Sequence, residues 1–487
     1  MTAPARWIDL AVIVAYLAGI TWFGAHFRSS QHTLRDYFLG GKTTPWWAIA
    51  LSIVSAETST LTVIGTPPLA FGGNFAFLQL VLGYLLARLV IATFFLPAYF
   101  RGEMFTAYEL MRRRFGERIR RLTAAAFLVL RALAEGVRVF AVSIVISVIL
   151  GSGETVSITA ILCLTLFYTY EGGLTAVIWT DVVQMALYVV GAVASLVLLL
   201  HQIPGGWAHV AAVAGPLGKL QVFDFRLAAP AVFFTRTYSF WAGVLGGCFL
   251  TTASHGTDQL MVQRLLAARN LGQSRTALLA SWVVIFVQFI LFLAIGTCLF
   301  VLYREQGAAA PAVLDRLYPL YIWEQLPAGM AGLVMAAILA AAMSNLSAAL
   351  NSLASTTILD LWKPLLGGAA DDATWLRRSR YMTLLWGVVL MGVALIARRW
   401  GSVLQAGLSI ASIVYGALLG VFLLGLFTRR VGEAAAMCGM SVGLVLPLYV
   451  RFATAVAFTW YVAIGASATF ITAVLVSWCT KEHNRGA

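Results

Sequence analysis

Long apolar stretches separated by short polar ones dominate the pattern of this chain. A helix needs about 20 apolar residues to cross the hydrocarbon core of a bilayer. Thirteen stretches approach or exceed this length, at roughly residues 8–26, 47–67, 75–99, 122–150, 154–170, 176–200, 235–254, 277–303, 327–357, 380–398, 403–427, 433–450 and 456–479. The pattern therefore predicts an all-α polytopic membrane protein with about 13 transmembrane helices.

The composition supports the same class. Of the 487 residues, 61% are hydrophobic and 11% are charged, whereas about 25% of a typical soluble chain is charged. This composition excludes a soluble enzyme, and it excludes a disordered chain, which would be poor in apolar residues. The five cysteines are scattered through apolar stretches and form neither a disulfide framework nor a metal-binding motif.

The basic residues predict how the chain is oriented. With thirteen spans, 21 of the 33 Lys and Arg fall in one set of loops and eight in the opposite set. The positive-inside rule places the larger group in the cytoplasm. We therefore expect an inner (plasma) membrane protein with its N-terminus outside and its C-terminus inside. The basic run from Arg112 to Arg121 then lies in a cytoplasmic loop near anionic lipid and is no nucleic-acid patch. We expect the bilayer and a small solute as partners and no nucleic acid. The sequence indicates no protein partner.

Three stretches, the second, the seventh and the ninth, are unusually polar for membrane spans. The first two of these are predicted to be interrupted. The second carries Glu57, a series of hydroxyls from Ser55 to Thr62, and a Gly-Thr-Pro-Pro segment at 65–68 that we expect to break the helix. The seventh contains Gly246-Gly247 and continues into Thr257-Asp258. These stretches lie five spans apart, and each opens a block of five. Paired interrupted helices in corresponding positions are typical of inverted-repeat secondary transporters.

Four motifs carry a resemblance to a known family. In chain order they are Asp36–Gly41 (DYFLGG), Gly172–Gln184 (GGLTAVIWTDVVQ), Asp258-Gln259 with Gln263-Arg264, and Ala340–Ser347 (AAAMSNLS). Together they resemble the sodium/solute symporter family. The resemblance implies a LeuT-type 5+5 inverted-repeat core with one extra N-terminal and two extra C-terminal helices.

The resemblance also implies a division of the chain. Residues 1–45 would hold the extra N-terminal helix and the first cytoplasmic loop, and residues 46–200 the first repeat. An external loop would follow at 201–234 and the second repeat at 235–428. Residues 429–487 would form the two C-terminal helices and a short cytoplasmic tail.

A main sodium site follows from the resemblance, with sodium as the only cofactor. Its ligands would be the backbone carbonyls of Ser55, Thr58 and Ala341 and the side chains of Ser344 and Asn345. Sodium is a hard cation that prefers oxygen ligands, and an unwound turn exposes carbonyls that a helix would use internally. Asn345 departs from the family, which more often has a hydroxyl there.

Some family members have a second sodium site. Here it would use Asp181, Ser344 and Ser347, but the last expected hydroxyl is replaced by Ala348. Asp181 could equally act as a helix-capping or gating acid. We also expect Asp258 and Arg264 to form an inner structural or gating pair.

Charges at membrane depth suggest where a substrate binds. Arg131, Glu135 and Arg138 share one face of the fourth span, and each charge is costly there unless it faces protein or water. They could form a buried ion network, or Arg138 could bind a substrate carboxylate through its planar guanidinium. The candidate substrate-binding residues are Glu57, Ser59, Thr62, Gln79, Glu135 and Arg138.

Two of these candidates have several possible roles. Glu57 could balance a substrate cation, pair with Arg138 or take part in proton coupling. Gln79 could line the cavity or make an interhelical hydrogen bond.

The sequence therefore predicts a sodium-coupled secondary symporter that imports a small organic solute by alternating access, with a carboxylate as the suggested substrate. A proton-coupled or uncoupled transporter or channel of the same fold is the alternative. A membrane sensor and an intramembrane enzyme are less favoured. We predict no catalytic residue, because no HExxH motif or suitably placed histidine base is present.

Overall fold

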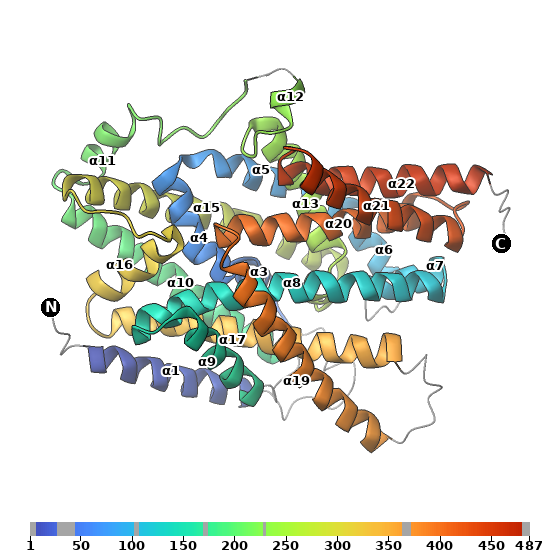
Figure 1. Ribbon diagram of the computed structural model, residues 1–487, viewed down its shortest axis with the longest axis horizontal. Helices are drawn as coiled ribbons and strands as arrows, with labels where there is room; N and C mark the ends of the chain where they lie inside the picture. Colours follow the sequence, from blue (N-terminus) through green and yellow to red (C-terminus); the bar gives the residue numbers. More distant parts are fainter. Residues whose placement is uncertain are drawn as a thin grey trace.

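A computed structural model describes residues 6–26, 44–101, 107–168, 174–226, 230–362 and 372–479. Within these ranges the chain forms helices and turns and no strand. Most of the long helices run along the horizontal axis of Figure 1, with α1 beginning at one end of the molecule and α22 ending at the other. The DYFLGG motif lies outside the described residues, as does the start of the motif at 172.

Each of the thirteen predicted stretches coincides with a helical segment. The first two are α1 (Arg6–His26) and the pair α3 (Trp46–Glu57) and α4 (Thr60–Gly72). The third is a continuous run of η3 (Phe75–Phe77), α5 (Leu78–Val90), η4 (Ile91–Phe95) and α6 (Leu96–Phe100). The next three are α8 (Glu117–Leu150), α9 (Glu154–Tyr168) and α10 (Leu174–Gln202). In the second half they are α13 (Phe240–Gly256), α15 (Leu271–Glu305), α17 (Met330–Thr356), α19 (Asp372–Ala397), α20 (Val403–Phe427), α21 (Glu433–Ala453), and η7 (Phe458–Trp460) with α22 (Tyr461–Cys479).

Shorter helices connect these spans. They are α7 (Ala107–Arg114), α11 (Gly206–Ala214), α12 (Pro230–Phe233), α14 (Gln259–Leu266), η5 (Leu314–Arg316), α16 (Leu317–Gln325) and η6 (Thr357–Trp362). Over the described residues, eight helices are long and apolar enough to cross a membrane, and the bent pair α3–α4 makes a ninth. The polytopic membrane class is therefore confirmed, with the number of spans approximate. The other four predicted spans fall on α1, α9, α13 and α19, which do not meet this criterion over the described residues.

The predicted break in the second span is present, but it lies at Thr58-Ser59. Here α3 and α4 meet at 64°. Ser59 has an extended backbone, and the Thr58 amide closes the last turn of α3 by donating to Val54 O at 2.7 Å. The expected breaker, the Gly-Thr-Pro-Pro segment at 65–68, stays within α4. Its role is close packing, because Gly296 of α15 has no room for a side chain against the Pro67 backbone.

The seventh span also differs from the prediction. Helix α13 is continuous through Gly246-Gly247 and is interrupted only at its end, before Asp258 caps α14. The glycines instead let α13 lie directly against α5. A Cβ at Gly247 would overlap the carbonyl oxygen of Leu80, and one at Gly83 would overlap that of Val244. Small residues thus permit close helix packing here, as they commonly do in membranes.

We expect Gly247→Ala to lower the melting temperature of the purified protein by several degrees. The added methyl group meets rigid backbone of α5, and overpacking typically costs about 1–3 kcal/mol. The matched control is Gly19→Ala in α1, where nothing lies within 4 Å. That variant should be as stable as the wild type or more so, because alanine favours the helix. Equal melting temperatures for Gly247→Ala and Gly19→Ala would contradict the packing account.

Candidate functional site

The break between α3 and α4 frees two backbone carbonyls. In a continuous helix the amides of Ser59 and Thr62 would bind the carbonyls of Ser55 and Thr58. Here the Ser59 amide donates to Glu57 O at 3.0 Å, and the Thr62 amide donates to Ser59 O at 2.8 Å. The Ser55 and Thr58 carbonyl oxygens thereby lose their helical donors, and carbonyls freed in this way can coordinate cations in discontinuous membrane helices.

Helix α17 brings the other predicted sodium ligands. It packs against α4, α8 and α10. Ala341 is buried, whereas Asn345 and Ser347 are partly exposed. The side chains of Ser344 and Ala348 lie outside the described ones. Both sodium ligand sets therefore stay predictions.

Asp181 of α10 lies in a buried hydrogen-bonded cluster. Its carboxylate accepts from the Ser52 hydroxyl of α3 at 2.6 Å and from Arg264 Nη2 of α14 at 3.0 Å. The Arg264 Nε also donates to Ser52 Oγ at 2.9 Å. The cluster ties three separate helices together, and the role of Asp181 as a sodium ligand or as a gating acid stays a prediction.

The prediction that Asp258 pairs with Arg264 is wrong. Arg264 pairs with Asp181, while Asp258 accepts from the Tyr415 hydroxyl at 2.7 Å. Asp258 also accepts from the Leu260 amide as the N-cap of α14. A capping carboxylate is turned toward its own helix terminus. Arg264, in the last turn of the same short helix, meets the carboxylate of α10 instead.

Glu57, at the end of α3, pairs with a cation that the sequence analysis did not assign to it. Arg88 Nη2 of α5 donates to Glu57 Oε2 at 2.6 Å, and Arg88 also donates to Ser281 Oγ at 3.2 Å. The His255 ring lies at 3.3 Å from the same carboxylate oxygen. Arg88 is fully buried. The position of Arg88 in the middle of an apolar stretch could have indicated a buried ion pair, because a cation at that depth needs a partner of opposite charge.

The three charges of α8 form the ion network that was one of the two alternatives. Arg131 and Arg138 both contact Glu135 Oε1, at 3.1 and 2.6 Å. The Arg138 side chain is 28% exposed, against 8% for Arg131 and 1% for Glu135. Within the described part of the chain, the Nε of Arg138 has no hydrogen-bond partner. Arg131 Nε likewise has no partner among the described residues, so Arg138 is distinguished within the network by its greater exposure.

The remaining candidates separate into two places. Ser59 and Thr62 are buried at the break, where the Thr62 hydroxyl donates to the Glu57 carbonyl at 3.4 Å. Gln79 lies at the start of α5, and its side chain binds the loop that precedes α13. Its Nε2 donates to Tyr238 O at 2.8 Å, and its Oε1 accepts from the Asp224 amide at 3.0 Å. Gln79 thus makes structural hydrogen bonds to the backbone of that loop.

The family can now be assigned. Residues 37–443 match the model of the sodium:solute symporter family, which is most of the chain. The chain belongs to that family. This confirms the predicted resemblance and the transporter class, and the protein is not an enzyme.

Individual relatives agree with the assignment. The chain is 26% identical over 485 residues to the sodium/sialic acid symporter SiaT of Proteus mirabilis, covering 96% of this chain and 95% of that protein. It is 28% identical over 450 residues to the sodium-coupled monocarboxylate transporter 1 of Mus musculus, covering 91% of this chain and 72% of that protein.

Solved structures show the same fold. A substrate-bound, outward-open Na⁺-coupled sialic acid symporter superposes with a TM-score of 0.83 at 26% identity, covering 97% of this chain and 98% of that chain. The inward-facing structure of Mhp1 shares the fold, with a TM-score of 0.57 at 15% identity, covering 90% of this chain and 92% of that chain. The predicted LeuT-type fold is confirmed.

We expect Glu57→Gln to destabilise the protein by about 3–5 kcal/mol, because the change leaves the buried Arg88 charge without a counter-ion. The double variant Glu57→Gln/Arg88→Met should recover most of this loss, since it removes both charges. A thermal-melting double-mutant cycle on purified protein measures the coupling. If the effects of the two single changes simply add, the pair is not the constraint that we describe.

Proposed function

We propose that this protein is a sodium-coupled symporter that imports a small organic carboxylate across the plasma membrane by alternating access. The observation that carries the proposal is the release of the Ser55 and Thr58 carbonyls where α3 and α4 meet. The chain belongs to the sodium:solute symporter family, and its matched relatives include sodium-coupled transporters, so sodium is the cation that we assign to these oxygens. Sodium would be coordinated there together with Ala341, Ser344 and Asn345 of α17.

We propose a single coupled sodium ion. The second candidate site needs the Asp181 carboxylate, and Arg264 and Ser52 already bind that group. A sodium ion would have to displace the guanidinium from a buried ion pair, which is unfavourable. One sodium ion entering down 100 mV releases about 2.3 kcal/mol, enough for roughly 50-fold accumulation.

Arg138 is the proposed anchor of the substrate carboxylate. It is more exposed than its partners in the α8 network, and it uses a single nitrogen, Nη1, to bind Glu135, so the guanidinium has further donors for a second carboxylate. Several of the matched relatives are named for sialic acid or for monocarboxylates, and these solutes share the carboxylate group. The shared chemistry supports an organic acid.

The proposed topology follows from charge. The loops with the larger set of Lys and Arg would face the cytoplasm, which places the start of α1 outside and the end of α22 inside. The repeats at 46–200 and 235–428 would then move against each other around the sodium and substrate sites.

Replacing Ser344 by Ala should raise the sodium concentration for half-maximal uptake at least several-fold, because the main site loses one oxygen ligand. Uptake into proteoliposomes over a sodium titration measures this, and Ser441→Ala on the exposed face of α21 is the control. An unchanged sodium dependence would remove α17 from the site. Wild-type uptake should show a Hill coefficient of one, and a coefficient near two would contradict the single-ion proposal.

Removing the Arg138 guanidinium should weaken substrate binding by about 2–5 kcal/mol, roughly 30-fold to several thousand-fold. Arg138→Lys should retain part of the affinity, because it keeps the charge and loses the fork. Sodium-dependent uptake of sialic acid, lactate and pyruvate, each compared with its amide, identifies the substrate class. A well-folded Arg138→Ala variant with unchanged affinity for a transported acid would refute the anchor.

A further inference from the structure

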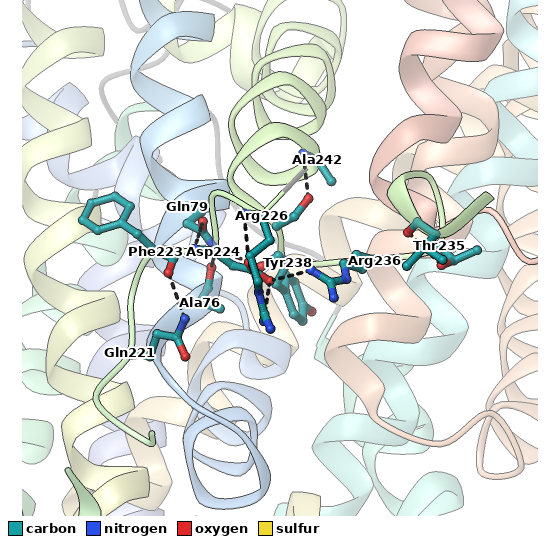
Figure 2. Close-up of polar contacts among 12 residues, drawn as sticks. Ala76, Gln79, Gln221, Phe223, Asp224, Arg226, Thr235, Arg236, Tyr238 and Ala242 are labelled. Carbon is teal, nitrogen blue, oxygen red and sulfur yellow. Dashed lines mark hydrogen bonds and ion pairs between the residues drawn. The ribbon is translucent and has the colours of Figure 1, made fainter. Parts of the chain in front are cut away.

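A compact ion cluster lies in the loop before α13, away from the membrane-embedded charges. We call Asp224, Arg226 and Arg236 the Asp224 cluster. Arg226 donates two hydrogen bonds to the Asp224 carboxylate, from Nε to Oδ1 at 2.8 Å and from Nη2 to Oδ2 at 3.1 Å. Arg236 Nη1 reaches Oδ2 at 3.2 Å. Figure 2 shows both guanidinium groups directed at the same carboxylate.

The cluster carries one excess positive charge. Hydrogen bonding to Arg226 lowers the pKa of Asp224, so the carboxylate is ionised at neutral pH and cancels one of the two guanidinium charges. Arg226 binds the carboxylate as a fork with two nitrogens and is 71% exposed, whereas Arg236 contributes a single nitrogen and is 33% exposed. The unused edge of Arg236 can therefore receive a second carboxylate, for which a planar guanidinium is well suited.

A cavity of about 340 Å³ adjoins the cluster. Its volume lies within the range of about 300–1,000 Å³ that is typical of small-molecule sites. Besides the Asp224 cluster, its lining includes Asn74, Gln221, Thr237 and Tyr238. A small organic acid placed in it would meet both the cation and neutral polar groups.

The backbone around this cavity is held in place before any ligand binds. Gln79 of α5 binds the Asp224 amide and the Tyr238 carbonyl, as described above. The Phe240 amide donates to the Asp224 carbonyl at 2.9 Å, and the rings of Phe225 and Phe240 pack at 4.6 Å. A site that is already ordered loses little conformational entropy on binding.

Tyr238 connects the cavity with the transporter core. Its ring packs against Phe77 at 5.5 Å, and its hydroxyl accepts from Gln405 Nε2 of α20 at 3.5 Å. One face of the cavity is therefore made by a residue that contacts the core helices.

We propose that the Asp224 cluster and its cavity form an outer, sodium-independent binding site for a small carboxylate, with Arg236 as its anchor. The inference rests on the proposed function in one respect, that the transported solute is a carboxylate. The site would hold the solute at the mouth of the pathway before it passes inward to Arg138. It is separate from the sodium site, because none of its residues belongs to α3, α4 or α17.

The experiment uses trifluoroacetate as a small carboxylate probe and full-length protein in detergent. Fluorine NMR line broadening is titrated in sodium-free choline buffer. Wild type should broaden the signal saturably, and Arg236→Gln should weaken binding at least tenfold, with Arg236→Lys intermediate. Asp224 keeps its Arg226 fork in both variants, so the loop should stay folded, and melting curves check this. Arg451→Gln on α21 removes one Arg charge outside the cavity and should bind as wild type does.

The experiment distinguishes a failure of the outer site from a failure of the proposed function. Arg138→Gln should leave sodium-free binding of the probe intact. If no carboxylate is transported but binding still depends on Arg236, the proposed substrate class fails and the outer site stands. Absence of saturable binding in wild type, unchanged binding in Arg236→Gln, or an equal loss in Arg451→Gln would overturn the outer site.

Discussion

Inside a bilayer no water is available to bind a free amide or carbonyl, so every backbone polar group needs a partner within the protein. This requirement accounts for the helical character of the described chain, and it makes the break at Thr58-Ser59 meaningful. At that point the helical hydrogen-bond pattern is interrupted, and the amides of Ser59 and Thr62 bind nearer carbonyls. The carbonyl oxygens of Ser55 and Thr58 lose these amide partners, and a bound cation would replace them.

Buried charged side chains also need partners within the protein, and an unpaired charge costs more than an unpaired backbone group. Glu57 meets Arg88, Asp181 meets Arg264, and Glu135 meets two arginines. Each cluster except that of α8 joins helices distant in sequence, so the charges also fix how these helices sit against one another. The clusters at Glu57 and Asp181 both involve α3, the helix that leads into the break. If α3 moves during transport, these ion pairs must either move with it or be replaced by other pairs.

Close helix packing supplies the other constraint. Glycines at the contact of α5 and α13 and at the contact of α4 and α15 allow backbone to approach backbone. Helix α5 therefore holds Arg88 opposite Glu57 while its first turn holds the loop of the Asp224 cluster through Gln79. One rigidly packed helix thus links a buried ion pair to the outer cavity.

The sequence by itself determined the helical spans, since the cost of placing a residue in lipid depends mainly on the residue itself and sums along the chain. It also determined the family through its motifs, and it located the broken span from the polar residues between Ser55 and Thr62. The resemblance placed the unwound turn beside Glu57, and the structure has the break there, whereas the residue pattern also pointed to a second breaker at 65–68. Pro67 and Pro68 looked like the stronger breakers, but they remain helical in a closely packed environment.

Only the tertiary structure decided which charges meet. Arg88 lies 31 residues from Glu57, and Arg264 lies 83 residues from Asp181. Such pairs depend on how each helix is rotated and which neighbours it packs against, and no local pattern encodes either. By contrast, the network of Arg131, Glu135 and Arg138 was predictable as an alternative, because helical spacing alone places the three residues on one face. Gln79 needed the fold as well, since its partners belong to a loop that only long-range packing brings to α5.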